Sequence, residues 1–192
     1  DIFYDTMNDV LPRKLKYIFM PIFNIIEKLT FNRANKINLV SEGFKKYFSS
    51  KFPNKSLTFY SNGIDDLFIR KTVTQNQAQK NDPLVILYAG NMGEGQGLDL
   101  IIPKIAKELG NEIIFKVIGD GGGRAKLEKE IEGFKNVIIQ KPLKREELLV
   151  EYEKADVLFL HLNNYEAFEK VLPSKLFEYA ATGKPIWAGV SG

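Results

Sequence analysis

Two side chains of opposite charge, Lys175 and Glu178, lie about one helical turn apart near the end of the chain. The preceding Pro173 and Ser174 favour the start of a helix and Gly183 favours its end, which predicts a helix of about two and a half turns. A carboxylate one turn into a helix can accept hydrogen bonds from two neighbouring hydroxyls, as on a ribose, while the N–H groups at the helix start suit a phosphate. The pattern therefore indicates a site for a nucleoside diphosphate.

A simpler interpretation of the same pair stays open. At the i, i+3 spacing, Lys175 and Glu178 would form a surface ion pair worth a few tenths of a kcal/mol. At the helical period of about 100° per residue, the apolar and polar side chains of this segment separate onto two arcs. The first arc holds Leu176, Phe177, Ala180 and Ala181, and the second holds Ser174, Lys175, Glu178 and Thr182. We expect the first arc to pack against the protein.

The composition excludes several classes of protein. The 192 residues are 44% hydrophobic and 27% charged, an ordinary balance for a globular protein. The net charge of +3 is too small to argue for nucleic acid. With no cysteine and one histidine, His161, the chain cannot build a thiolate site, a disulfide scaffold or a histidine-rich metal site. These features fit a reducing cytoplasm, and we find neither a signal-peptide pattern nor an apolar window long enough for a membrane span.

The first third of the chain predicts helices and short strands. Residues 11–34 have a helical pattern that we expect Pro21 to interrupt, and their basic and aromatic side chains leave two interpretations open. Residues 11–30 either pack against their own domain, as amphipathic helices commonly do, or contact a membrane surface. The remaining expected elements are strands at 37–40 and 57–60, a helix starting at Ser41, and a turn with positive φ at Asn62-Gly63.

From Pro83 onward, apolar strands alternate with helices, which predicts an α/β fold with a doubly wound, Rossmann-like parallel sheet. The expected strands are 84–89, 113–118, 137–139, 157–162 and 185–188, and the expected helices are 98–109, 124–131 and 145–154. Ligands of such sheets bind beyond the carboxyl ends of the strands. The glycine-rich loops 90–97 and 119–123 both follow strands, so both lie at that edge, and we expect them to present backbone N–H groups to a phosphate.

Spacing rules out two common phosphate-binding motifs. Neither loop gives G-x-G-x-x-G, because the last position is Arg124 in one loop and Leu98 in the other. The Gly183-Lys184 pair is followed by Pro185 and lacks the glycine loop of a Walker A motif. A dinucleotide dehydrogenase and a P-loop enzyme are therefore both disfavoured.

Three segments carry a family resemblance: Tyr-Ala-Gly-Asn-Met-Gly from Tyr88, Ile-Gly-Asp-Gly from Ile118, and Pro-Ser-Lys-Leu-Phe-Glu-Tyr-Ala-Ala-Thr-Gly-Lys-Pro-Ile from Pro173. In this order and approximate spacing they resemble the donor domain of the retaining GT-B glycosyltransferases, specifically glycosyltransferase family 4 of the bacterial surface-polysaccharide type. The resemblance implies that Glu178 holds the ribose. It implies a substrate-binding set of Gly90, Asn91, Met92, Gly93, Gly119, Asp120, Gly121, Lys141, Leu172, Pro173, Ser174, Lys175 and Glu178. It leaves the catalytic residues unassigned.

The chain departs from the family pattern at two positions. The first of the family's two glutamates would fall at Lys170, which leaves the sugar contact unassigned. The basic residue often present in the first glycine loop is Gln96 here. Neutralisation of a phosphate would then fall to backbone amides, Lys175, Arg124 or Lys141. We expect a structural role for His161 at its strand end.

The resemblance implies transfer of a hexose or N-acetylhexosamine from a nucleotide-diphosphate sugar, with UDP as the expected nucleotide, to a glycan or lipid-linked acceptor. It implies retention and no metal or other cofactor. A sugar-nucleotide epimerase and a non-catalytic nucleotide-sugar binding module are the alternatives. The expected domains are residues 1–66 from the end of the acceptor side, a linker at 67–82 and a donor domain at 83–192, so the chain reads as a fragment. We expect a cytoplasmic protein, with the inner face of the membrane and a homodimer as further partners to test.

Overall fold

The computed structural model describes residues 3–70 and 82–191, which group into two compact units. The first unit comprises Asp1–Gly63, Asn164–Ser174 and Ser191–Gly192, and the second comprises Ile64–Asn163 and Lys175–Val190. Most of the expected linker, residues 71–81, lies outside the described residues. The functional roles expected for residues 1–66 and 83–192 stay predictions.

The second unit is built on a parallel sheet of five strands in the order β5-β4-β3-β6-β7. The strands are β3 (Leu84–Asn91), β4 (Ile113–Asp120), β5 (Val137–Gln140), β6 (Val157–His161) and β7 (Ile186–Gly189). This order confirms the predicted α/β fold. The register pairs Gly90 with Gly119 and Asn91 with Asp120, so β3 and β4 end side by side.

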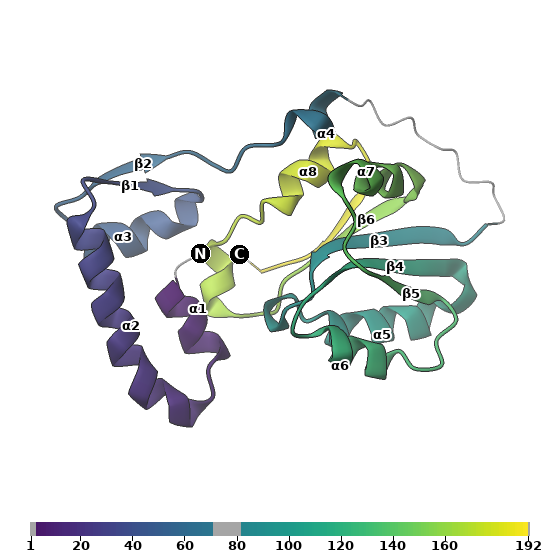
Figure 1. Ribbon diagram of the computed structural model, residues 1–192, viewed down its shortest axis with the longest axis horizontal. Helices are drawn as coiled ribbons and strands as arrows, with labels where there is room; N and C mark the ends of the chain where they lie inside the picture. Colours follow the sequence, from purple (N-terminus) through teal and green to yellow (C-terminus); the bar gives the residue numbers. More distant parts are fainter. Residues whose placement is uncertain (1–2, 71–81, 192) are drawn as a thin grey trace. The chain divides into compact units, whose positions relative to one another are not determined.

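Helices cover both faces of this sheet (Figure 1). On one face α5 (Leu98–Leu109) and α6 (Arg124–Glu130) pack over a core that includes Phe115 and Leu127. The other face carries α4 (Asp66–Arg70), α7 (Arg145–Lys154) and α8 (Lys175–Ala181). Short 3-10 turns at η2 (Glu94–Gln96) and η3 (Gly110–Glu112) flank α5. The bounds of α5 and α7 are those expected. Gly97 and Gly110 delimit α5, and α7 begins where Glu147 Oε2 accepts a hydrogen bond from the Lys144 N–H at 3.1 Å.

The first unit holds a two-stranded parallel sheet, β1 (Lys36–Leu39) paired with β2 (Ser56–Phe59). Its other elements are α1 (Phe3–Val10), α2 (Arg13–Arg33), η1 (Glu42–Phe44), α3 (Lys45–Lys51) and η4 (Glu166–Lys170). Phe44, Phe48 and Phe52 form most of its core. Ser41 starts η1 as expected, because its hydroxyl accepts a hydrogen bond from the Gly43 N–H at 3.2 Å.

Two local expectations for the first unit are wrong. Pro21 does not interrupt α2, which continues through it. Proline removes one helical hydrogen bond and leaves the carbonyl of Tyr17 without its donor, but Tyr17 is 75% exposed, so water can satisfy that group. Gly63 does not adopt a positive φ. It lies in a stretch without regular structure between β2 and α4, where no tight turn demands that conformation.

The buried face of α8 also differs from the expected arc. Tyr179 is fully buried and Thr182 is buried, whereas Ala180 is exposed. Tyr179 packs against Tyr152 on α7, with ring centroids 5.5 Å apart, and its hydroxyl accepts a hydrogen bond from the Ala89 N–H at 3.2 Å. Thr182 can be buried because its hydroxyl donates to the Tyr179 carbonyl at 2.7 Å. Helical periodicity alone could not reveal these long-range and local partners.

Candidate functional site

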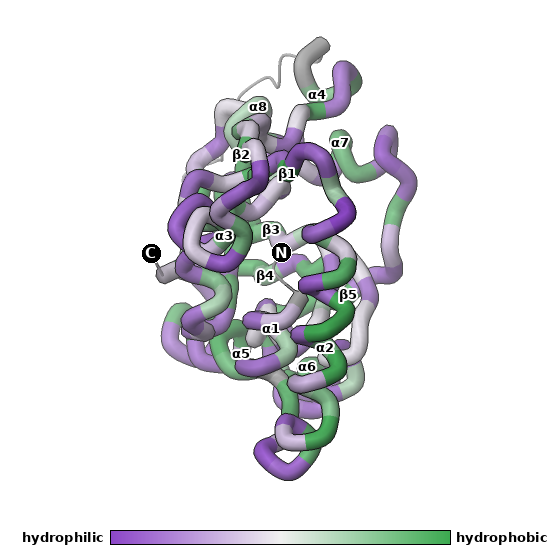
Figure 2. The backbone as a smooth tube through the Cα atoms, turned by 90° about the vertical axis from the view of Figure 1, so that its left-hand side faces the viewer, coloured by the Kyte–Doolittle hydropathy of each residue, from purple (hydrophilic) through white to green (hydrophobic). Residues whose placement is uncertain are grey.

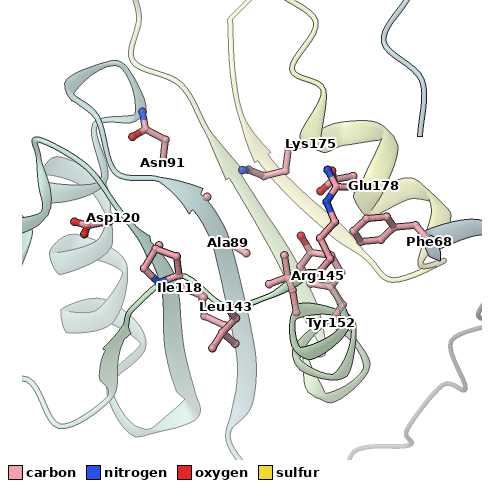
Figure 3. A pocket seen from close by; sticks show the side chains of 14 residues that line it. Phe68, Ala89, Asn91, Ile118, Asp120, Leu143, Arg145, Tyr152, Lys175 and Glu178 are labelled. Carbon is pink, nitrogen blue, oxygen red and sulfur yellow. The ribbon is translucent and has the colours of Figure 1, made fainter. Parts of the chain in front are cut away.

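A pocket of about 400 Å³ opens where β3 and β4 end (Figure 3). It lies wholly within the second unit, and six of the expected site residues line it: Gly90, Asn91, Gly119, Asp120, Lys175 and Glu178. The strands bring the first four together through the in-register pairing of β3 and β4, and α8 supplies the last two. The carboxyl-end rule for parallel sheets therefore placed this half of the pocket correctly.

Lys175 reaches the pocket from the first turn of α8. Its Nζ lies 5.3 Å from the centre of the Tyr88 ring, a cation–π contact, and it makes no ion pair with any described residue. Burial lowers the pKa of Lys175, an effect that the nearby Glu178 carboxylate only partly opposes. The pocket thus holds a half-buried ammonium group whose charge is not matched by a close protein partner.

Glu178 lies one turn further along α8 and lines the same pocket. Its carboxylate forms no ion pair within the described part of the chain, and its approach to the Tyr152 hydroxyl is outside the geometry of a formed hydrogen bond. Arg145, its neighbour in Figure 3, is paired instead with Asp65 and lies over the Phe68 ring, 5.9 Å from its centre. The oxygens of Glu178 therefore keep their capacity to accept hydrogen bonds from a ligand.

The glycine loops present fewer free N–H groups than expected. The N–H of Met92 donates to the Asp120 carbonyl at 2.8 Å, and the N–H of Gly121 donates to Asp120 Oδ1 at 2.8 Å. The N–H of Gly93 donates to Gln96 Oε1 at 3.0 Å. The Met92 side chain is 1% exposed and belongs to the core. These three amides are occupied by the loops themselves and are not free to donate to a ligand.

Other residues expected to contact the phosphates or sugar do not line the pocket. Arg124 is held by Glu128 at 2.8 Å and by the Gly119 carbonyl at 3.2 Å. Lys141 is exposed and is not among the lining residues, although Pro142 and Leu143 directly after it are. Leu172, Pro173 and Ser174 group with the first unit and are likewise not among the lining residues.

Several lining residues were missed by sequence reasoning. They are Phe68, Ala89, Ile118, Pro142, Leu143, Arg145, Leu148 and Tyr152. The loop after β5 could have been found by extending the carboxyl-end rule to the third strand. Phe68 and Tyr152 carry no such signal, because they come from α4 and α7 and meet only when both helices pack on the sheet.

Lys170 and His161 both have partners within the protein. Lys170, at the place of the family's first glutamate, pairs with Asp5 at 3.0 Å inside the first unit. His161 Nδ1 lies 2.6 Å from the Gln96 carbonyl oxygen, and its ring stacks on Phe159. These contacts agree with the structural role expected for His161, and His161 does not line the pocket.

Within residues 3–70 and 82–191, no group of three or more histidine or acidic side chains is placed to hold a metal ion. None of the helices described is long and apolar enough to cross a bilayer.

Comparison with known proteins points to a glycosyltransferase family. Residues 70–192 match the family model described as glycosyl transferases group 1. The chain is 29% identical over 164 residues to WcaI of Escherichia coli (strain K12), which is provisionally named a colanic acid biosynthesis glycosyl transferase. That alignment covers 84% of this chain and 40% of WcaI, so the chain spans well under half of that relative.

Solved structures show the same fold. Sucrose-phosphate synthase from Thermosynechococcus elongatus superposes with a TM-score of 0.71 at 17% identity, covering 90% of this chain and 45% of that one. HepE from Anabaena, in complex with UDP-glucose, superposes with a TM-score of 0.69 at 14% identity, covering 92% and 50%. The expected GT-B glycosyltransferase fold is confirmed. Because the family model matches well over half of its residues, this chain belongs to the glycosyl transferases group 1 family.

Proposed function

We propose that this chain forms the donor-binding part of a retaining glycosyltransferase. The enzyme would transfer a hexose or N-acetylhexosamine from a UDP-sugar to a glycan or lipid-linked acceptor. One observation carries the proposal: Lys175 and Glu178 enter one pocket at the carboxyl ends of β3 and β4, and neither has an ion-pair partner among the described residues. The UDP-glucose bound to HepE, which shares the fold, supports the nucleotide.

In this reaction the bond between the sugar C1 and the diphosphate oxygen breaks, a bond from C1 to the acceptor oxygen forms, and the acceptor hydroxyl loses its proton. Negative charge grows on the departing diphosphate. An ammonium group held in a partly water-excluded pocket stabilises such charge more strongly than it would in bulk water. Lys175 fills this role in our proposal, which includes no metal or other cofactor.

Glu178 is assigned to the two ribose hydroxyls. Charge-assisted hydrogen bonds of this kind contribute about 1.5 to 3 kcal/mol, so Glu178→Ala should weaken UDP binding by roughly tenfold or more. Glu178→Gln should also weaken it, because the amide replaces one acceptor oxygen by a donor. Isothermal titration calorimetry of the purified chain with UDP tests this. Glu146→Ala, which removes an exposed carboxylate on α7 outside the pocket lining, is the matched control.

If UDP affinity is the same in wild type, both Glu178 variants and the control, the ribose assignment is wrong. If the wild type binds no UDP, GDP or ADP at all, the nucleotide-sugar function itself is wrong.

We also propose a membrane contact through α2, at the inner face of a cytoplasmic membrane. Large apolar side chains on α2 are exposed to solvent. They include Tyr17 at 75%, Ile18 at 62%, Ile25 at 57% and Ile26 at 53% exposure. The green segments of its tube in Figure 2 mark its hydrophobic residues. Arg13, Lys14 and Lys16 lie at the start of the same helix. Apolar side chains next to basic ones suit the surface of an anionic bilayer.

A further inference from the structure

Tyr152 is a fully buried tyrosine in the last turn of α7, with 0% of its surface exposed. Its ring packs edge-on against Tyr179, with centroids 5.5 Å apart, and lies 6.0 Å from the Phe68 ring. These are contacts of the aromatic ring alone. A phenylalanine would make the same contacts, so packing does not account for the hydroxyl group.

The Tyr152 hydroxyl has no hydrogen-bond partner within the described residues. A buried polar group without a partner costs free energy, because water satisfied it in the unfolded chain. Yet Tyr152 lines the pocket together with Glu178, so its hydroxyl can meet either a ligand or the carboxylate. In Figure 3 it lies on the same side of the pocket as Phe68, Arg145 and Glu178.

The negative charge of Glu178 affects the pKa of the Tyr152 hydroxyl. Burial raises the pKa of Tyr152 above its ordinary value of 10.0, and the nearby Glu178 carboxylate raises that pKa further. The hydroxyl therefore keeps its proton at neutral pH and can act only as a neutral donor or acceptor. The Glu178 carboxylate is close enough to act on this hydroxyl as an acceptor, although their geometry is outside that of a formed hydrogen bond.

We propose that Tyr152 is a positioning residue for the nucleotide, acting through Glu178. When a ribose occupies the pocket, the Tyr152 hydroxyl donates a hydrogen bond to the Glu178 carboxylate and holds it in the plane that accepts both ribose hydroxyls. A carboxylate has about four lone-pair sites, so one bond from Tyr152 leaves enough for two from the ribose. This inference rests on the proposed function, because it assumes a ribose at Glu178.

The test compares binding of UDP and 2′-deoxy-UDP by calorimetry in wild type and Tyr152→Phe. We expect the variant to bind UDP several-fold more weakly, while 2′-deoxy-UDP, which offers only one of the two hydroxyls, changes little. The ratio of UDP affinity to 2′-deoxy-UDP affinity should therefore be smaller in Tyr152→Phe than in wild type. We also expect the unfolding temperature of Tyr152→Phe to stay equal or rise, because the lost hydroxyl had no partner.

Tyr179→Phe is the matched control, since it removes the hydroxyl of the adjacent buried ring, which accepts from the Ala89 N–H. It should lower the unfolding temperature and leave the ratio of UDP to 2′-deoxy-UDP affinity unchanged. If wild type binds UDP and loses it on Glu178→Ala, but Tyr152→Phe keeps both the affinity and the ratio, Tyr152 has no positioning role. If wild type binds no nucleotide, the proposed function fails and this inference fails with it.

Discussion

The ammonium group of Lys175 lies against the backbone of Gly90, where a Cβ atom would come within 1.9 Å of Lys175 Nζ. Gly90 also adopts a φ of +152°, a conformation that residues with a side chain rarely adopt. The glycine at the end of β3 therefore leaves the space that the lysine occupies. This relationship links the end of β3 to the first turn of α8.

Gly90→Ala should weaken UDP binding by about tenfold, because the new methyl group displaces the ammonium from its place. The strained φ should also lower the free energy of unfolding by about 1 to 3 kcal/mol. Calorimetry and urea unfolding on the same preparation measure both effects. Gly122→Ala is the control in the neighbouring loop, since a Cβ at Gly122 meets nothing within 4 Å. Equal UDP affinity in Gly90→Ala and Gly122→Ala would contradict this account of Lys175.

The UDP affinity should depend on pH through Lys175. Burial lowers the pKa of this lysine below its ordinary value of 10.5, and a bound diphosphate should raise that pKa again because it favours the charged form. At a pH between the pKa of Lys175 in the free protein and its higher pKa in the complex, Lys175 is protonated in the complex but not in the free protein. Binding should therefore take up a proton there and weaken as pH rises through the pKa of the free protein.

Calorimetry in buffers of different ionisation enthalpy measures this proton uptake. Lys175→Arg is the control, because a guanidinium stays charged across the whole range, and any titration of UDP itself is common to both proteins. A wild-type pH profile that coincides with that of Lys175→Arg up to pH 10.5 would show that Lys175 does not meet the diphosphate.

The stability of the C-terminal end of α8 should depend on the buried hydroxyl of Thr182. That hydroxyl donates to the Tyr179 carbonyl at 2.7 Å and accepts from the buried Lys184 N–H at 3.2 Å. Thr182→Val should lower the free energy of unfolding by about 1 to 3 kcal/mol, since it leaves the Lys184 N–H without its partner. Urea unfolding should show a smaller loss for Thr182→Ser, which keeps the hydroxyl. Equal losses would assign the effect to packing instead.

The α2 surface should bind anionic vesicles at low salt and release them at high salt, because a shorter Debye length screens Arg13, Lys14 and Lys16. Co-sedimentation with phosphatidylserine-containing vesicles measures this. Replacing Ile18 and Ile25 together by serine should reduce the bound fraction, and neutral vesicles are the control. A chain that ignores vesicles but doubles its solution mass through the same isoleucines would show that α2 pairs with a second copy instead.

Much of this protein was determined by local sequence alone. Strands buried on both faces of a parallel sheet read as continuous apolar runs, so β3 and β4 could be recognised before their partners were known. Loops that follow such strands must share one edge, which placed Gly90 and Asp120 in the same pocket. The family resemblance of the α8 segment, together with the one-turn spacing of Lys175 and Glu178, predicted the two charged residues that α8 contributes to the pocket.

Only the tertiary structure decided what surrounds these residues. Arg145 pairs with Asp65 across 80 positions of sequence, and Tyr152 meets Phe68 and Tyr179 only because α4, α7 and α8 pack on one face of the sheet. Helical periodicity ranks the faces of a helix by polarity, but it cannot say which face another helix will cover. For that reason the sequence pointed to the Glu178 carboxylate of this pocket and missed the buried tyrosine beside it.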